Sequence, residues 1–294
     1  MKAAPFAYHD PRSVEEALHL LATLENARLL AGGQSLMPML NMRVAFPDHL
    51  IDLNRVEGLA GVTAEGGALR IGAMTRQRDI EESPLVRAHL PLMSEALTHV
   101  GHRQTRNRGT IGGSLCNLDP SAELVAVATA LDAVLEVQGP SGARDLSIHE
   151  LPLGFMTPSL APEEMLTAIR IPLPPAGHGA AFEEFARRHG DYAITSAAAV
   201  LVLEGGRIAR ASLTLGGVGA GPLRLRSAEA ALAGQAPSEA LLREAAAACG
   251  SIDAMSDPQA PAWYRRRLAA TLARRALTAA ASRATTPARQ GGLA

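Results

Sequence analysis

The sequence predicts a two-domain protein of the α+β class, on three observations. Its 294 residues are enough for two domains with cores of their own, at about 100–200 residues per domain. Short strand-like runs alternate with helical patterns before residue 172, whereas the later strands form a hairpin that Ala-rich helices follow. A Pro- and Gly-rich segment, residues 172–179, lies between these two parts and indicates a linker.

The N-terminal part opens with an amphipathic helix. Ser13 and Glu16 have capping-box spacing, and apolar residues recur at helical intervals over residues 14–24. An apolar run then stops at Gly32-Gly33, which predicts a strand, a glycine turn and a short helix. The elements expected in this part are strands 29–31, 49–53 and 69–73 and helices 35–42 and 84–100.

A second glycine segment, Gly112-Gly113-Ser114, is expected to form a turn. Asp119 and Pro120 after it have the composition of a helix N-cap and first helical residue. Residues 281–294 lose all periodicity and are expected to be a disordered tail. The other expected elements are helix 122–131, strands 133–137, 165–171, 180–186, 194–203 and 208–215, and helices 227–232, 238–248 and 262–280.

Composition and charge exclude several kinds of partner and site. The formal net charge is -1 and Lys and Arg are scattered, which argues against nucleic acid. No apolar run approaches the roughly 20 residues of a membrane span, and the start lacks the apolar core of a signal peptide, so we expect a cytoplasmic protein. Two cysteines without C-x-x-C spacing and thinly spread histidines predict no metal site and no iron–sulfur cluster in this chain.

The two glycine segments are the features most suggestive of a ligand site. Adjacent glycines let consecutive backbone N–H groups face one way, with no Cβ to keep a phosphate at a distance. A Ser follows each pair, and helix starts nearby favour an anion. Each segment alone is more typical of a surface turn than of a phosphate site. As a pair they suit the two phosphates of a dinucleotide.

Other motifs do not meet the requirements of their chemistry. Residues 217–222 lack the third glycine of a dinucleotide fingerprint and have Pro222 where the helix would form. Cys116 replaces the second glycine of a nucleophile elbow, and no Asp and His of a triad are identifiable downstream. No catalytic residue is therefore assigned.

The chain resembles a known family in several segments. AGGQSLMPMLNMR (residues 31–43) and GTIGGSLCNLDPSAEL (residues 109–124) look like the two FAD-pyrophosphate loops of the flavoprotein medium subunits of molybdenum hydroxylases, within the xanthine dehydrogenase family. They are most similar to the medium subunits of aerobic carbon monoxide dehydrogenases. Five further segments match in family order: FAYHDPRSVEEAL, IDLNRVEGLAGV, LRIGAMTRQRDIE, LAPEEMLTAIRIPLPP and RRHGDYAITSAAAVL.

The resemblance implies a noncovalent FAD and the residues that bind it. It implies a two-part FAD-binding domain of the PCMH type, residues 1–176 with subdomains of about 1–55 and 56–176. A small domain, residues 177–280, with an antiparallel sheet packed by helices would follow. The implied pyrophosphate segments are Ala31, Gly32, Gly33, Gln34, Ser35 and Leu36, and Thr110, Ile111, Gly112, Gly113 and Ser114.

Three further residues receive roles from the resemblance. Glu123 matches an acid that bonds the ribose hydroxyls, although an exposed acid in the first turn of a helix is an equal alternative. Asp191 and Tyr192 match a family loop near the isoalloxazine ring, with core packing as the alternative for the Tyr. Ser114 stands where much of the family has Asn, which shortens the reach of that side chain.

The function that the resemblance implies is electron transfer inside a complex. A large subunit would hold molybdopterin and a small subunit two [2Fe-2S] clusters, as a dimer of heterotrimers. This chain would pass electrons to an external acceptor, either quinone, NAD or oxygen. Two alternatives stay open, a self-sufficient FAD-dependent oxidoreductase of the same superfamily and a scaffold that has lost its flavin.

Overall fold

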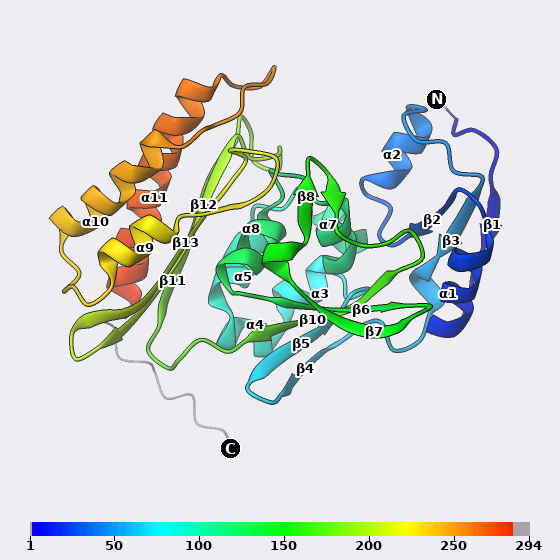
Figure 1. Ribbon diagram of the computed structural model, residues 1–294, viewed down its shortest axis with the longest axis horizontal. Helices are drawn as coiled ribbons and strands as arrows, with labels where there is room; N and C mark the ends of the chain where they lie inside the picture. The colour runs from blue at the N-terminus through cyan, green and yellow to red at the C-terminus, as the bar shows by residue number, and fades with distance from the viewer. Residues whose placement is uncertain (1, 285–294) are drawn as a thin grey trace. The chain divides into compact units, whose positions relative to one another are not determined.

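The computed structural model describes residues 2–284 and confirms the α+β class (Figure 1). The chain forms two compact units that interlace along the sequence. Within the described residues, the first comprises residues 2–86, Gly101–Asp119 and Asp132–Pro172, and the second comprises Arg87–Val100, Pro120–Leu131 and residues 173–284. Two helical segments from the N-terminal half therefore belong to the unit that is otherwise C-terminal.

The first unit begins with a small parallel sheet in the order β1-β3-β2. Helix α1 (Val14–Thr23) is capped by the Ser13 hydroxyl, which accepts from the Glu16 N–H at 3.2 Å. Ala17 and Leu21 of this helix are buried in one core cluster with Ile51 of β3. The strands are β1 (Ala7–His9), β2 (Ala27–Leu30) and β3 (His49–Asp52), and helix α2 (Leu36–Asn41) follows β2.

A five-stranded antiparallel sheet completes the first unit, in the order β4-β5-β10-β6-β7. Its central strand β10 (Met165–Pro172) is buried along almost its whole length, and α7 (Ile111–Asn117) packs against it. The flanking strands are β4 (Val62–Glu65), β5 (Ala68–Gly72), β6 (Val134–Gly139) and β7 (Gly142–Ser147). The unit also contains the hairpin β8 (Pro152–Gly154) and β9 (Thr157–Pro158) and helices α3 (Gln77–Glu82) and α6 (Arg103–Arg108), and helix α4 (Pro84–His89) begins in it and ends in the second unit.

The second unit is a four-stranded antiparallel sheet between two layers of helices (Figure 1). The long helix α11 (Ala262–Ala284) lies along β11 and β12, and a Cβ on Gly179 would overlap the Ala280 carbonyl. Helices α5 and α8 pack on strands of the same sheet. The remaining bounds are α5 (Pro91–Leu97), α8 (Glu123–Ala130), β11 (Gly179–Phe185), β12 (Thr195–Glu204), β13 (Arg207–Gly216), β14 (Leu223–Arg224), α9 (Arg226–Leu232) and α10 (Glu239–Ala247).

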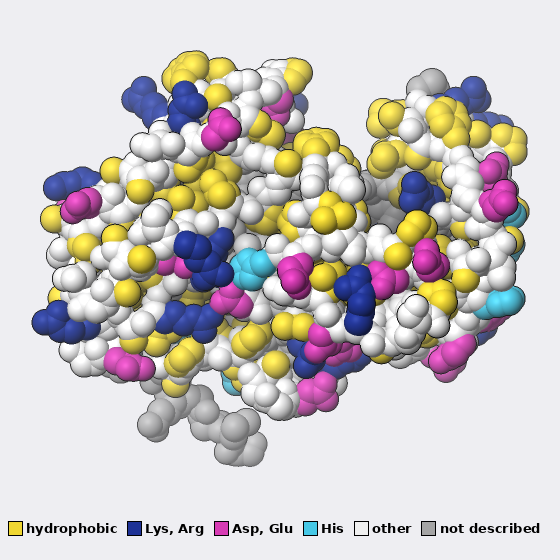
Figure 2. All heavy atoms as spheres, viewed as in Figure 1, with side chains coloured by type: hydrophobic (Ala, Val, Ile, Leu, Met, Phe, Trp, Pro, Cys, Tyr) yellow, Lys and Arg dark blue, Asp and Glu magenta, His cyan; other side chains and the backbone are white. Residues whose placement is uncertain are grey.

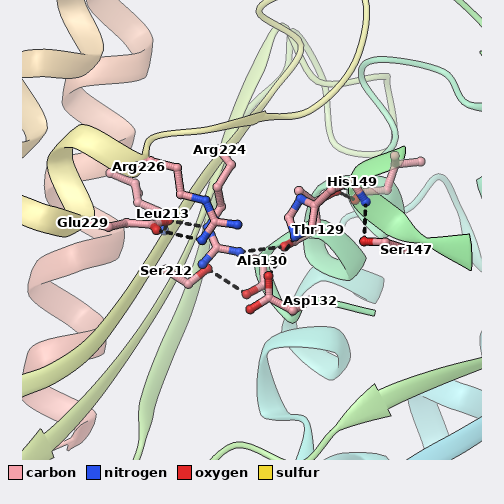
Figure 3. A network of polar contacts seen from close by, with 11 residues as sticks. Thr129, Ala130, Asp132, Ser147, His149, Ser212, Leu213, Arg224, Arg226 and Glu229 are labelled. Atoms are coloured by element: carbon pink, nitrogen blue, oxygen red, sulfur yellow. Dashed lines mark hydrogen bonds and ion pairs between the residues drawn. The ribbon is translucent and has the colours of Figure 1, made fainter. Parts of the chain in front are cut away.

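A buried ion pair ties α9 and α8 to β13 and β14 in this unit (Figure 3). Arg224 and Glu229 have side chains only 7% and 9% exposed and are hydrogen-bonded to each other. Glu229 also accepts the Leu213 N–H at 2.8 Å, and Arg224 donates to the Thr129 carbonyl at 3.1 Å. The two charges thus neutralise each other, and the same side chains form hydrogen bonds with backbone groups of β13 and α8.

The structure corrects four of the expected elements. The single helix expected over residues 84–100 is two helices, α4 and α5, because Pro91 cannot continue the first. The second glycine segment lies inside helix α7 rather than in a turn. Helix α8 begins at Glu123 with Ala122 as N-cap, so Asp119 and Pro120 precede it. Helix α11 continues to Ala284, and the rest of the expected tail lies outside the described residues.

The surface carries charges of both signs. On the face in Figure 2, Lys and Arg side chains are interspersed with Asp and Glu. Apolar side chains gather at the surface around the end of α2 in the same view, where Met42, Val44 and Phe46 are exposed. Among residues 2–284, no helix combines the length and the apolar character that a bilayer crossing requires.

Candidate functional site

The first glycine segment connects β2 to α2 and exposes a row of backbone donors. Gly33 has φ +73°, a conformation that L side chains rarely adopt. Within the described residues, the backbone N–H groups of Gly32, Gly33, Gln34, Ser35 and Leu36 donate no hydrogen bond. Consecutive donors without a protein acceptor are costly unless a ligand or water accepts from them. The segment therefore has the chemistry of an anion site.

The second glycine segment differs, because its donors are already used. Ile111 donates to the Thr75 carbonyl at 3.3 Å and Gly112 to the Ala73 carbonyl at 2.9 Å. The Gly113 N–H reaches the Thr110 hydroxyl, which caps α7, and the Ser114 N–H reaches the Thr110 carbonyl, both at 3.1 Å. The expectation of an N–H nest at this segment is wrong, because protein oxygens already accept from these four N–H groups.

The two segments lie against each other, so the second shapes the site that the first provides. A Cβ on Gly32 would overlap the carbonyl oxygen of Arg108, just before the second segment. A Cβ on Gly113 would come within 3.3 Å of the Ala31 Cβ. The backbones approach this closely only because both positions are glycine.

Two residues that the sequence did not single out hold this contact together. The Arg76 guanidinium donates to the Arg108 carbonyl and to the Asn54 side-chain oxygen, each at 2.5 Å. Asn54 in turn donates to the Ala31 carbonyl at 3.1 Å. Burial and the neighbouring Arg108 lower the pKa of Arg76 from its ordinary value. Both residues fall in segments that match the family, IDLNRVEGLAGV and LRIGAMTRQRDIE, which is the one sequence signal for them.

These residues fit the pyrophosphate of FAD. Five backbone donors that have no acceptor in the described part of the chain follow β2, in a segment whose glycines leave room for close approach. A diphosphate accepts several hydrogen bonds at once and favours a nearby fixed cation such as Arg76. The segment is thus suited to bind a diphosphate.

The cysteine nearest the glycine segments is not an activated nucleophile. Cys116 of α7 is the thiol nearest the glycine segments in sequence, and burial raises its pKa to about 12. A thiol with that pKa stays protonated at neutral pH and is a weak nucleophile.

Glu123, Asp191 and Tyr192 belong to the second unit, whereas both glycine segments belong to the first. Asp191 and Tyr192 are exposed in the loop between β11 and β12, and Tyr192 is 50% exposed, which excludes core packing as its role. Glu123 is the first residue of α8 and 5% exposed, so the alternative of an exposed helix acid is wrong.

Glu123 has an acidic neighbour, Glu184 of β11. Burial, and then the charge of Glu123, raise the pKa of Glu184 to about 8. One Glu184 oxygen lies 3.9 Å from His99 Nδ1, and the other has no hydrogen-bond partner among the described residues. At neutral pH Glu184 is therefore a protonated carboxyl inside the second unit.

Two protein-family models match consecutive parts of the chain. Residues 4–174 match the FAD-binding domain in molybdopterin dehydrogenase, and residues 180–280 match the C-terminal domain of CO dehydrogenase flavoprotein. The two matches together span nearly the whole chain and meet at the predicted linker.

Characterised relatives match over their full length. The carbon monoxide dehydrogenase medium chain of Afipia carboxidovorans is 41% identical over 95% of this chain and 98% of its own. The 6-hydroxypseudooxynicotine dehydrogenase complex subunit alpha of Paenarthrobacter nicotinovorans is also 41% identical, over 97% of each chain. Among solved structures, carbon monoxide dehydrogenase from Hydrogenophaga pseudoflava superimposes with a TM-score of 0.94 at 40% identity, covering 96% of this chain and 99% of that chain.

The sequence comparisons and the site agree. Two consecutive family models and relatives matched over nearly their whole length fit a chain whose glycine loop has the chemistry of an anion site. The chain belongs to the FAD-binding medium subunits of molybdenum-containing hydroxylases and dehydrogenases, in the xanthine dehydrogenase family.

Proposed function

We propose that the chain is the FAD-binding electron-transfer subunit of a heterotrimeric molybdenum hydroxylase. It would receive electrons from the [2Fe-2S] clusters of a small subunit and pass them to an external acceptor. The observation that carries the binding part is the row of backbone donors from Gly32 to Leu36, which has no acceptor among the described residues. The family supports the rest.

The binding roles follow from the chemistry of each residue. The donors of residues 32–36 bind the pyrophosphate, and Thr110–Ser114 form the wall against which that loop is held. Asp191 and Tyr192 face the isoalloxazine ring. Glu123 accepts from the ribose hydroxyls, as a carboxylate does in related dinucleotide sites.

This role needs few reactive side chains. When bound, FAD supplies the redox chemistry, because it exchanges electrons singly or in pairs, and the protein supplies binding and orientation. A chain that binds through backbone N–H groups and excludes water needs no general base or nucleophile. The half-buried thiol of Cys116, whose raised pKa keeps it protonated at neutral pH, agrees with a binding role for this chain.

Exposed aromatic rings support assembly with partner subunits. Six of the nine aromatic residues are substantially exposed, and all nine lie within residues 2–284. Aromatic side chains are enriched at protein interfaces and are seldom left in water in such a proportion. The exposed rings are Tyr8, Phe46, Phe155, Phe185, Tyr192 and Trp263.

The partners we propose are a large molybdopterin-binding subunit and a small [2Fe-2S] subunit, as a dimer of heterotrimers in the cytoplasm. Relatives equally similar to this chain are named for carbon monoxide and for 6-hydroxypseudooxynicotine. The large subunit therefore sets the substrate. Quinone, NAD and oxygen are the candidate acceptors.

Purification of the chain alone and of the three-subunit complex tests this function. The chain alone, loaded with FAD, is expected to be yellow and to reduce no dye with carbon monoxide or 6-hydroxypseudooxynicotine as electron donor. The complex should reduce the dye with one of them.

Two other outcomes would favour the alternatives. Turnover by the chain alone would show a self-sufficient oxidoreductase and contradict the subunit assignment. A colourless chain that takes up no FAD on reconstitution would show a scaffold.

A further inference from the structure

Arg265, in the first turn of α11, is a charged residue at the centre of the second unit. Its residue surface is only 1% exposed. Nη1 donates to the carbonyl oxygens of Ile194 and Gly217, the latter at 2.5 Å. Nη2 lies 2.6 Å from the Asp257 carboxylate. Nε has no hydrogen-bond partner among the described residues, so the buried guanidinium depends on these three acceptors, which fix its position.

Asp257 is itself fixed by the segment that precedes α11. Its carboxylate accepts the N–H groups of Gln259 at 2.9 Å and Ala260 at 3.0 Å. Burial alone would raise the pKa of Asp257, but the Ala260 N–H and Arg265 lower it below its ordinary value. Arg265 is thus attached to a rigid segment, residues 257–260, on one side and to the Ile194 carbonyl on the other.

The Ile194 carbonyl belongs to the stem of the loop that carries Asp191 and Tyr192. The Ile194 N–H donates to the Phe185 carbonyl at 2.8 Å and closes the loop at its base. The Asp191 N–H donates to the Arg188 carbonyl at 3.1 Å and forms an inner turn.

The other stem of the loop is attached to the same segment. Arg187 donates from Nη2 to the Gln259 carbonyl at 3.0 Å. Two guanidinium groups therefore hold both stems of residues 186–193 on residues 257–260. Arg187 does so at the surface and Arg265 in the interior.

Gly217 shows how closely these parts fit. It has φ +70°, and a Cβ there would lie 2.6 Å from the Ile194 carbonyl oxygen. The Ile194 carbonyl therefore accepts from Arg265 and also lies against Gly217, so it has no room to move toward Gly217.

We propose that Arg265 is a positioning residue for the flavin. Through the Ile194 carbonyl it holds Tyr192, two residues earlier, in the place where that side chain meets the isoalloxazine ring. This inference rests on the proposed function. A planar guanidinium reaches acceptors on two sides at once, which an ammonium on a flexible stem does not, so lysine is a poor substitute.

Hydrogen exchange in the chain without FAD tests the first half of the proposal. Arg265→Lys is expected to speed exchange of the Asp191 and Ile194 amides about tenfold, since one charge-assisted hydrogen bond is lost. The amides of β13 should be unchanged. Arg267→Lys, an exposed neighbour on the same helix, is the matched control and should change nothing.

The flavin signature tests the second half. With FAD bound at full stoichiometry, Arg265→Lys should change the fluorescence yield and the midpoint potential of the flavin, whereas Arg267→Lys should leave both at the wild-type values. Arg187→Ala, which removes the surface attachment of the same loop, should shift both signals in the same direction and serves if Arg265→Lys fails to fold.

Three results would overturn the proposal. These are unchanged loop exchange, faster exchange throughout the second unit, and faster loop exchange with an unchanged flavin signature. If the proposed function itself were wrong, the wild-type chain would bind no FAD, which is a different result from the three above.

Discussion

Glycines 32 and 33 are adjacent, yet each is needed for a different physical reason. Gly32 is required by packing, because a side chain there would overlap the Arg108 carbonyl. Gly33 is required by its φ of +73°, while its surroundings are flexible side chains, Met37 Cγ at 3.1 Å and Leu30 Cδ1 at 3.3 Å. Gly33 is therefore the better position at which to separate ligand binding from folding.

We expect Gly33→Val to abolish retention of FAD. A Val Cβ would press on Met37 and Leu30, and the left-handed conformation itself would cost about 1–2 kcal/mol of stability, so the loop is expected to shift and its N–H groups to lose their common direction. Gly58→Val is the matched control, because Gly58 has φ +77° and nothing within 4 Å of its Cβ position. Both variants should unfold more easily, but only Gly33→Val should lose the yellow colour. Retention of FAD at wild-type stoichiometry by Gly33→Val would refute the placement of the pyrophosphate.

Glu184 gives the chain a pH-dependent stability of unusual sign for a carboxyl. Its pKa is about 8 in the folded protein against 4.5 for an ordinary glutamate, so the folded state keeps a proton that the unfolded state releases. This contribution is fully present below pH 4.5 and is lost as the pH rises through 8.

Glu184→Gln should therefore flatten the decline of Tm between pH 5 and pH 9. The variant should match the wild type near pH 5 and exceed it at pH 9. Glu183→Gln, on the neighbouring residue of β11, is the control and should keep the wild-type slope. Parallel Tm curves for Glu184→Gln and the wild type would show that this carboxyl ionises normally.

Among the helices and strands, the periodicity of apolar residues predicted those elements whose pattern is set by neighbouring residues in the sequence. Helices α1, α9 and α10 and the β12–β13 hairpin lie where their apolar patterns placed them, and α11 begins where expected but is longer. Helix α7 was missed because Gly112-Gly113-Ser114 has the composition of a turn. The helix forms because Thr110 caps it and Gly112 packs on Ala73, and contacts between distant residues are invisible in a window of sequence.

At the site, too, contacts between residues far apart in the sequence could not be predicted. The glycines and the family motifs located the two segments, but not the Arg76–Asn54 bridge, whose atoms come from separate parts of the chain. Strand β7 was missed as well, because its GARDLS sequence is polar and it forms an edge of the sheet.

The Arg224–Glu229 pair is expected to stabilise the packing of α8 and α9 on the sheet. Glu229→Ala would leave a buried guanidinium unpaired and the Leu213 N–H without its acceptor, at a cost of about 3–5 kcal/mol. Arg226→Ala removes a side chain that is 63% exposed and contacts the same carboxylate, and should cost less than about 1 kcal/mol. Urea unfolding monitored by circular dichroism measures both, and equal losses would contradict the role of burial.

For the whole molecule, the exposed aromatic residues predict which parts of the surface contact the other subunits. Phe46→Ser and Phe155→Ser remove rings that are 58% and 61% exposed. Each should change the stability of the isolated chain by no more than about 0.5 kcal/mol and weaken its association with the other subunits.

Sedimentation of the purified chain with co-expressed large and small subunits measures that association. Arg243→Ser, at an exposed position of α10, is the control for a general surface change. Unchanged affinity in both Phe variants would show that these rings face solvent in the complex too.

Trp263 is the chain's single tryptophan, 60% exposed, with its ring 5.6 Å from that of Tyr264. An indole in water emits at longer wavelength than one shielded by protein, so the chain carries an optical probe where α11 begins. A subunit that covers this point would shift the emission to the blue during a titration, and one that docks elsewhere would leave it unmoved. The order in which the complex is built can thus be followed in real time without a label.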